Sequence, residues 1–264
     1  LRSRGLGDVY KRQIQNALKS GGRIIPVDSE QSAIFQCLMA GRRSDLKKLI
    51  LTASGGPFRN STLEEMEHAG PEQALNHPIW NMGKKISLDS ATMFNKGLEI
   101  MEAAFLFDME GDAIEVLLHP QSIVHSMVEF IDGSIIAQLG TADMRTAIQY
   151  SLTYPERIKS EVKPLSLFDE RPLTFERPDV ARFPAIKLAY AALNGGNALP
   201  IVYNAANEAA GSMFLAGTTG FLDIARRVEY AMERAQALDF ANADNYEAIV
   251  EIDRQARRLA QEKV

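Results

Sequence analysis

KISLDSATMFNKGLE, residues 85–99, is the stretch around which the rest of the chain is organised. Its first residues, with Ile86 and Leu88 alternating, are typical of a short strand, and its second half has the spacing of a helix. Ser90 is the predicted N-cap of that helix. Free N–H groups and the positive helix end at such a junction form a natural site for an anion, especially phosphate.

The polar residues of the predicted helix suit a ligand that carries both a phosphate and a metal. Asn95 and Glu99 are four residues apart and share one helix face, with Lys96 adjacent. The simpler interpretation is a capped, solvated amphipathic helix with an ordinary Lys–Glu pair. Taken alone, the stretch favours this simpler interpretation.

The composition is that of an ordinary soluble globular protein. The chain has 264 residues, of which 46% are hydrophobic and 24% charged, and its net charge of −5 argues against nucleic acid or an anionic membrane as the main partner. No apolar run approaches the roughly 20 residues that span a bilayer. The single cysteine, Cys37, excludes an intrachain disulfide and indicates a reducing compartment. We interpret it as a buried structural thiol.

The chain divides into four parts by pattern. Residues 1–13 show no core-facing period and are interpreted as a tail or as foreign sequence. Residues 14–153 mix helices and strands and predict an α/β or α+β catalytic domain with a mixed sheet. Residues 154–184 are rich in proline and predict an extended linker. Residues 185–264 predict an all-α helical bundle, with helices over 185–194, 200–216, 220–237 and 244–262.

Within the catalytic domain, the pattern predicts a short helix at 14–20, a longer helix at 61–76 with capping boxes, and several strands. The predicted strands cover 23–27, 46–53, 114–118, 128–131 and 134–139. The dipeptide Asp132-Gly133 predicts a tight hairpin between the last two.

Two carboxylates follow the first predicted strand. Asp28 and Glu30 would share one face of an extended chain, close enough to flank one cation. Oxygen ligands of this kind suit Mg²⁺ or Mn²⁺. The alternative is that Asp28-Ser29-Glu30 caps a helix that starts near Gln31, and for the isolated motif this alternative is favoured.

Two loops complete the candidate site. The run Ser54-Gly55-Gly56-Pro57 follows a strand and can bring backbone N–H groups and a hydroxyl to a phosphate. The segment from His77 to Gly83 contains the only tryptophan, Trp80. It fits equally a loop that closes over a ligand and a surface loop anchored by Trp80. Neither a P-loop nor a G-x-G-x-x-G fingerprint occurs in the sequence.

Several motifs, in their order along the chain, resemble the 1-deoxy-D-xylulose 5-phosphate reductoisomerase family of the non-mevalonate isoprenoid pathway. The resemblance covers nearly everything from about Ile14 onward. The matching segments are PVDSE (26–30), SGGPF (54–58), HPIWNMGKKISLDSATMFNKGLE (77–99), HPQSIVHSMVEF (119–130), GTADMRTAI (140–148) and NAANEAA (204–210).

The resemblance implies an NADP-dependent oxidoreductase and isomerase of the bacterial cytoplasm, expected to be a homodimer. Its reaction is a metal-assisted intramolecular rearrangement of 1-deoxy-D-xylulose 5-phosphate, followed by reduction with NADPH to 2-C-methyl-D-erythritol 4-phosphate. By the same resemblance the metal ligands are Asp28, Glu30 and Glu99, and the catalytic residues are Glu30, Glu99 and His77. The substrate-binding residues implied are Ser29, Ser54, His77, Trp80, Ser90, Asn95, Lys96 and His125, with Met82 in a closing loop and Met144 near the nicotinamide.

Two departures from the family stand out. The nucleotide-binding domain expected before Ile14 is missing from these residues, so we expect this fragment to be inactive alone. The segment between Cys37 and Leu46 is also shorter than expected. Three alternatives stay open: a metal-dependent phosphosugar isomerase or aldolase without nicotinamide, a related reductoisomerase-like oxidoreductase, and a non-catalytic interaction module built on the helical bundle.

Overall fold

The structure is a computed structural model that describes residues 17, 19–80, 82–169, 172–196, 198–237 and 245–262. The chain forms two compact units that interleave in sequence. The sheet unit comprises Ala17–Gly55 and Asp112–Pro178, and the described residues of the helical unit lie within Gly56–Gly111 and Asp179–Val264. The four linear parts deduced from sequence remain a prediction. The tail 1–13 and most of the helix predicted at 14–20 lie outside the described residues.

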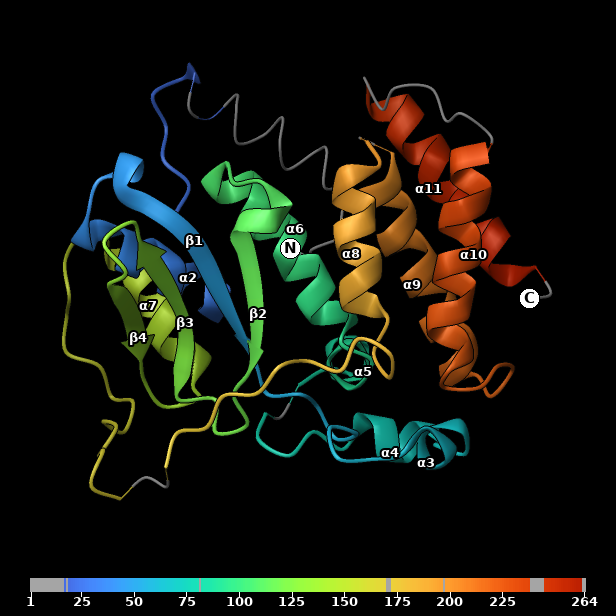
Figure 1. Ribbon diagram of the computed structural model, residues 1–264, viewed down its shortest axis with the longest axis horizontal. Helices are drawn as coiled ribbons and strands as arrows, with labels where there is room; N and C mark the ends of the chain where they lie inside the picture. The colour runs from blue at the N-terminus through green and yellow to red at the C-terminus, as the bar shows by residue number, and fades with distance from the viewer. Residues whose placement is uncertain are drawn as a thin grey trace. The chain divides into compact units, whose positions relative to one another are not determined.

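The sheet unit contains a mixed sheet of four strands in the order β2-β1-β3-β4 (Figure 1). The strands are β1 (Leu46–Ala53), β2 (Ile114–Leu118), β3 (Val124–Phe130) and β4 (Ile135–Leu139). β1 pairs in parallel with β2 and antiparallel with β3, and β4 pairs antiparallel with β3. Leu49, Ile50 and Leu51 of the central strand β1 are all buried, although consecutive side chains of a strand point to opposite faces. The hairpin predicted at Asp132-Gly133 is confirmed.

Two helices lie on one face of this sheet, α2 (Ser29–Cys37) and α7 (Met144–Thr153) (Figure 1). α2 packs against β1, β3 and β4, and α7 packs against α2. Three single turns of 3₁₀ helix complete the connections, η1 (Leu38–Ala40), η2 (Arg43–Asp45) and η3 (Gly111–Ala113). Cys37 is buried in α2, as predicted, and burial raises the pKa of its thiol to about 11.

The strand predicted at residues 23–27 is wrong. Residues 23–27 have no regular secondary structure, and Val27 is 45% exposed. The apolar letters resemble a buried strand, but this segment pairs with no strand of the described sheet. The segment serves instead as the lead into α2.

The helical unit begins with short helices. α3 (Leu63–Glu67) and α4 (Pro71–Leu75) occupy the region predicted as one helix over 61–76. The break follows from Pro71, which lacks the N–H group needed inside a helix and starts α4 instead. The capping box of Thr62 and Glu65 is confirmed. Next come α5 (Lys84–Ala91) and α6 (Phe94–Phe107).

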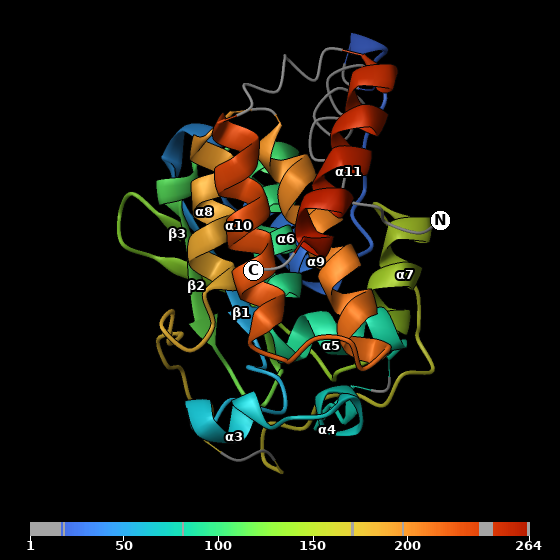
Figure 2. The same cartoon turned by 90° about the vertical axis from the view of Figure 1, so that its right-hand side faces the viewer.

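The four helices predicted at the carboxyl end are confirmed, with small shifts in their ends. They are α8 (Ala185–Asn194), α9 (Leu199–Leu215), α10 (Asp223–Ala237) and α11 (Tyr246–Gln261). α9 packs against α5, α6, α8, α10 and α11, and most of its residues are buried (Figure 2). The described part of residues 154–184 contains no helix, and its pairing with the sheet is a single bridge between Leu118 and Glu176. None of the described helices is long and apolar enough to cross a membrane.

Candidate functional site

The stretch 85–99 forms two helices rather than a strand and a helix. α5 starts at Lys84, so Ile86 and Leu88 are helical, and Ser90 is the second-last residue of α5 rather than an N-cap. The cap position of α6 is Met93, which has a φ of 63° and contributes no side-chain hydrogen bond. The predicted strand and the predicted cap at Ser90 are therefore wrong. A left-handed methionine is a strained break, which the alternating letters of the sequence do not indicate.

The first turns of α6 hold a buried polar cluster. The Glu99 carboxylate accepts hydrogen bonds from Asn95 Nδ2 on one oxygen and from Lys96 Nζ on the other. Lys96 and Glu99 are 4% and 2% exposed. The face shared by Asn95 and Glu99 was predicted from their spacing. Its burial was not, because a Lys–Glu pair is more often solvated.

Burial makes this cluster chemically consequential. Removing two charges from water costs several kcal/mol of hydration free energy for each charge. Their mutual attraction returns an amount of the same order. A buried ammonium, a buried carboxylate and an amide on one helix therefore form a site that can exchange its internal partners for a charged ligand. The arrangement can offer two donors to an anion and two carboxylate oxygens to a cation.

His77 lies in the loop before α5, and its side chain accepts hydrogen bonds from backbone N–H groups. Its Nδ1 accepts hydrogen bonds from the N–H groups of Ile79 at 3.2 Å and Trp80 at 2.9 Å. Nδ1 therefore carries no proton, and the neutral ring holds its proton on Nε2. Desolvation by burial lowers the pKa of His77 below its usual value. Trp80 and Met82 of the same loop are half-buried.

The turn after β1 approaches α5 closely. Gly56 has a φ of 66°, and a Cβ there would lie 2.6 Å from the backbone oxygen of Ser90. A side chain at this position would collide with α5, so glycine is required for the approach. Ser54, the last residue before Gly55-Gly56, is half-buried in the sheet unit.

The acidic residues of the sheet unit lie at a helix start. Asp28 is the N-cap of α2, and its Oδ1 accepts from the N–H groups of Glu30 at 3.0 Å and Gln31 at 3.2 Å. The alternative of a capping Asp28-Ser29-Glu30 motif is thus confirmed. Ser29 Oγ donates to Glu30 Oε2. Carboxylate oxygens of Asp28 and Glu30 still lie within 4.8 Å of each other, a spacing that one cation can occupy.

The remaining predicted residues also belong to the sheet unit. His125 is a half-buried residue of β3, and Met144 is the first residue of α7, behind the N-cap Asp143. His119, in contrast, is fully buried, accepts from Ile123 N–H at Nε2 and bonds Thr174 O through Nδ1.

The predicted site residues thus fall into two groups. The helical unit joins Asn95, Lys96 and Glu99 directly, and the sheet unit holds Asp28, Ser29 and Glu30 at one helix start. The roles assigned to all of these residues remain a prediction.

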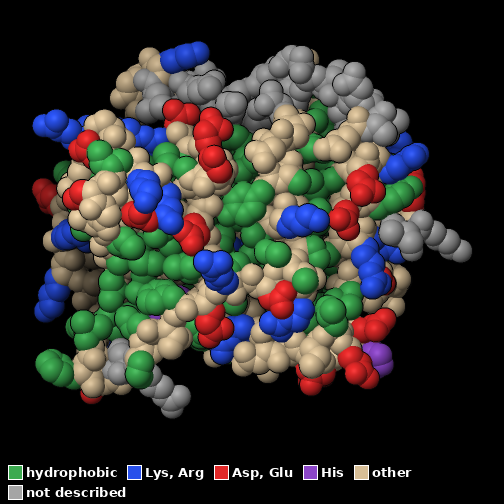
Figure 3. Space-filling model, in the orientation of Figure 1, with side chains coloured by type: hydrophobic (Ala, Val, Ile, Leu, Met, Phe, Trp, Pro, Cys, Tyr) green, Lys and Arg blue, Asp and Glu red, His purple; other side chains and the backbone are tan. Residues whose placement is uncertain are grey.

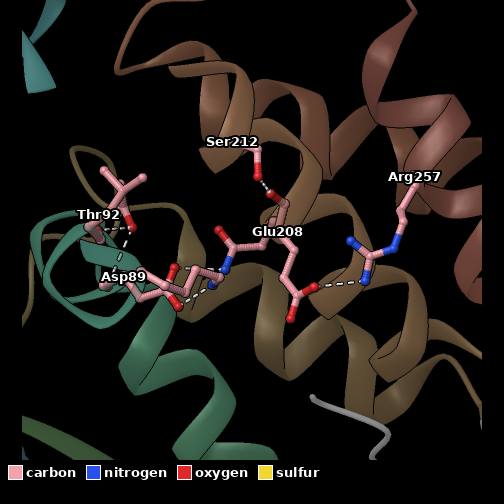
Figure 4. Close-up of polar contacts among 8 residues, drawn as sticks. Asp89, Thr92, Glu208, Ser212 and Arg257 are labelled. Atoms are coloured by element: carbon pink, nitrogen blue, oxygen red, sulfur yellow. Dashed lines mark hydrogen bonds and ion pairs between the residues drawn. The ribbon is translucent and has the colours of Figure 1, made fainter. Parts of the chain in front are cut away.

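One polar link near this site has no sequence signal. Asn207 Nδ2 of α9 donates to Asp89 Oδ1 of α5 at 2.9 Å, inside the helical unit (Figure 4). The two residues are 118 positions apart. Nothing in a single sequence pairs an amide with a carboxylate that lies so far away along the chain.

Two family models match the chain. Residues 24–107 match the 1-deoxy-D-xylulose 5-phosphate reductoisomerase C-terminal domain, and residues 139–259 match the DXP reductoisomerase C-terminal domain. The chain belongs to the 1-deoxy-D-xylulose 5-phosphate reductoisomerase family.

Curated relatives carry the same name. The 1-deoxy-D-xylulose 5-phosphate reductoisomerase of Chlorobium phaeovibrioides is 55% identical over 92% of this chain and 62% of its own length. The enzyme of Heliobacterium modesticaldum is 54% identical over 91% of this chain and 61% of its own length. The chain therefore spans about 62% of the length of the relatives it matches.

Solved structures of reductoisomerases are also similar to this chain. The Zymomonas mobilis reductoisomerase in complex with NADPH has a TM-score of 0.89 at 44% identity, over 97% of this chain and 65% of that chain. A reductoisomerase in complex with NADPH, fosmidomycin and magnesium has a TM-score of 0.89 at 42% identity, over 98% of this chain and 66% of that chain.

Proposed function

We propose that this chain supplies the metal- and phosphosugar-binding part of an enzyme that converts 1-deoxy-D-xylulose 5-phosphate to 2-C-methyl-D-erythritol 4-phosphate with NADPH. The names of the relatives support the activity, and the solved relatives bind NADPH and magnesium. The observation that carries the proposal is the polar cluster of Asn95, Lys96 and Glu99, in which Lys96 and Glu99 are buried and Asn95 is half-buried. A solvated helix face has no reason to bury a lysine and a glutamate together.

Asp28 and Glu30 of the sheet unit and Glu99 of the helical unit would hold the metal. The donor set fits, because three carboxylates suit Mg²⁺ or Mn²⁺ and oxygens of Asp28 and Glu30 lie within 4.8 Å of each other. A divalent metal bound there would polarise the ketone and stabilise the oxyanion that develops during the rearrangement. Ser29, which donates to Glu30, would orient that carboxylate and contact the substrate.

Ser54, Ser90, Asn95 and Lys96 would hold the substrate phosphate. In the structure, Asn95 and Lys96 donate to Glu99. If Glu99 turns to a cation, these two donors become available to an anion. Metal and phosphosugar should therefore bind with positive cooperativity, each lowering the cost of binding the other.

The loop of His77, Trp80 and Met82 would close over the substrate and exclude water. The neutral His77 ring offers an Nε2–H donor toward a substrate oxygen. His125 would lie near the substrate and Met144 near the nicotinamide. The bacterial cytoplasm as the location of the protein stays a prediction.

We propose that the protein forms a homodimer through its sheet unit. α2 and α7 lie on one face of the sheet, while Ile135 of the edge strand β4 is 52% exposed. Hydrophobic side chains gather over the strands on the other face (Figure 3). Light scattering should show a dimer that Ile135→Asp weakens; a monomer at all concentrations would contradict this proposal.

Calorimetry tests the proposed function. The 264 residues are titrated with 1-deoxy-D-xylulose 5-phosphate, with and without Mg²⁺, and then incubated with NADPH. We expect Mg²⁺-dependent sugar binding and little NADPH oxidation, since the sequence lacks a dinucleotide fingerprint. Release of a rearranged product without NADPH would instead favour an isomerase, and no binding at all would contradict the proposal.

A further inference from the structure

One face of α9 holds α5 and α6. Tyr203, Asn207 and Gly211 follow one another at intervals of four residues and therefore share a face of α9. Tyr203 packs its ring against Phe94 of α6, with ring centroids 5.0 Å apart. Asn207 bonds Asp89 of α5 at 2.9 Å. The helices that carry the proposed phosphate ligands are thus docked on one stripe of α9.

Close approach at both ends of this stripe confirms the docking. A Cβ at Gly97 of α6 would lie 1.8 Å from the Tyr203 hydroxyl. A Cβ added at Gly211 of α9 would lie 3.2 Å from the Leu88 side chain of α5, which is a tight contact. Glycine at these positions lets the helices approach closely, so small rotations of α5 are resisted.

The middle contact is polar and buried. Asp89 and Asn207 are 5% and 1% exposed. Asp89 Oδ1 accepts from Asn207, and Oδ2 accepts from Lys85 Nζ of its own helix. A buried carboxylate needs such donors, and Asn207 supplies one from outside α5.

We propose that Asn207 is a positioning residue for phosphate binding. It holds Asp89, and Ser90 is the next residue of α5, turned about 100° around the helix axis. Fixing the direction of Asp89 therefore fixes the direction in which the Cβ of Ser90 leaves the helix, from which its hydroxyl would reach the phosphate. This inference rests on the proposed function, which places Ser90 at the phosphate.

Other contacts hold α9 itself. Tyr203 donates to Ala185 O of α8 at 3.1 Å, and Glu208 bonds Arg257 of α11 at 2.7 Å (Figure 4). Replacing Asn207 should therefore release α5 without undocking α9. The expected effect is a loss of ligand affinity rather than a loss of the bundle.

The test compares two affinities in the full chain. Calorimetry with 1-deoxy-D-xylulose 5-phosphate in saturating Mg²⁺, and with Mn²⁺ alone, is run on wild type, Asn207→Ala and Ser212→Ala. Ser212 donates only within α9, to Glu208 O at 2.8 Å, and serves as the matched control. We expect Asn207→Ala to bind the sugar phosphate about tenfold or more weakly, with unchanged Mn²⁺ affinity, and Ser212→Ala to match wild type.

A swap keeps the test decisive if Asn207→Ala does not fold. Asp89→Asn with Asn207→Asp exchanges amide and carboxylate and should restore sugar-phosphate affinity relative to Asn207→Asp alone. Wild-type sugar-phosphate affinity in Asn207→Ala, an equal loss of Mn²⁺ affinity, or no recovery in the swap would overturn the inference. Absence of binding by wild type would overturn the proposed function, and this inference with it.

Discussion

Glu99 is the residue on which both halves of the proposed site depend. Its carboxylate is buried and accepts hydrogen bonds from Asn95 and Lys96, so replacing it removes one partner of a buried ion pair. Removing one partner of a buried ion pair typically costs about 3–5 kcal/mol. A measurement on Glu99 must therefore be read beside a measurement of stability.

His77 gives a prediction about pH. Burial lowers its pKa from 6.5, and two N–H groups donate to Nδ1 of the neutral ring. The folded state thus favours neutral His77, so its contribution to loop stability is complete above pH 6.5 and is lost as the pH falls through the lowered folded value. Trp80 fluorescence should report this change, since Trp80 is the only tryptophan.

Two variants control the His77 prediction. His77→Asn should remove the acid transition in Trp80 fluorescence, whereas the same change at the exposed His68 should leave it intact. An identical transition in His77→Asn would show that another group is responsible.

At the residue scale, the sequence predicted contacts between residues that lie a few positions apart. The Asn95–Glu99 contact and the Asp28 cap follow from positions three or four apart. The position of Ser90 was wrong because the left-handed turn at Met93 starts α6 three residues later than a serine cap would. The Asn207–Asp89 bond could not be predicted, because only the tertiary fold brings these residues together.

At the scale of elements, α9 is the helix on which the helical unit is built. The approach of α6 depends on Gly97, where a Cβ would lie 1.8 Å from the Tyr203 hydroxyl and 2.8 Å from its ring carbon Cζ. Tyr203 is fully buried, and burial, with a smaller contribution from Asp89, raises the pKa of its phenol well above the usual value.

Gly97→Ala should therefore destabilise the protein although alanine favours helices. Overpacking costs about 1–3 kcal/mol, and the helix propensity of alanine returns at most about 1 kcal/mol. Urea unfolding should show a net loss of up to about 2 kcal/mol in the free energy of unfolding. The cost should shrink in a Tyr203→Phe background, which removes the clashing hydroxyl.

Gly70→Ala provides the control, because a Cβ at Gly70 would meet no atom within 4 Å. Equal losses for Gly70→Ala and Gly97→Ala, or no recovery with Tyr203→Phe, would contradict the packing argument.

Elements with a strong period were predicted well. The helices α8 to α11 and the strands β1 and β2 match their predicted ranges closely, because the apolar spacing reflects the face that each buries. The exposed strand β4 was predicted from the hairpin signal at Asp132-Gly133. The strands predicted at 23–27 and 85–89 were wrong. Short apolar runs fit a strand or a helix equally, and only pairing partners or helix neighbours decide between them.

At the scale of the whole molecule, the chain passes from the sheet unit to the helical unit, then back to the sheet unit, and ends in the helical unit. The proposed metal ligands follow this path: Asp28 and Glu30 belong to the sheet unit and Glu99 to the helical unit. We propose that one metal is held by all three carboxylates. This joint coordination is the central claim about function.

Titration with Mn²⁺ tests that claim most directly. Glu99→Gln is compared by calorimetry with wild type and with Glu102→Gln, a half-buried carboxylate on the same helix, after urea unfolding has shown that each variant is folded. We expect Glu99→Gln to weaken Mn²⁺ binding at least about tenfold and Glu102→Gln to leave it unchanged. Mn²⁺ binding by folded Glu99→Gln as tight as that of wild type would contradict the claim.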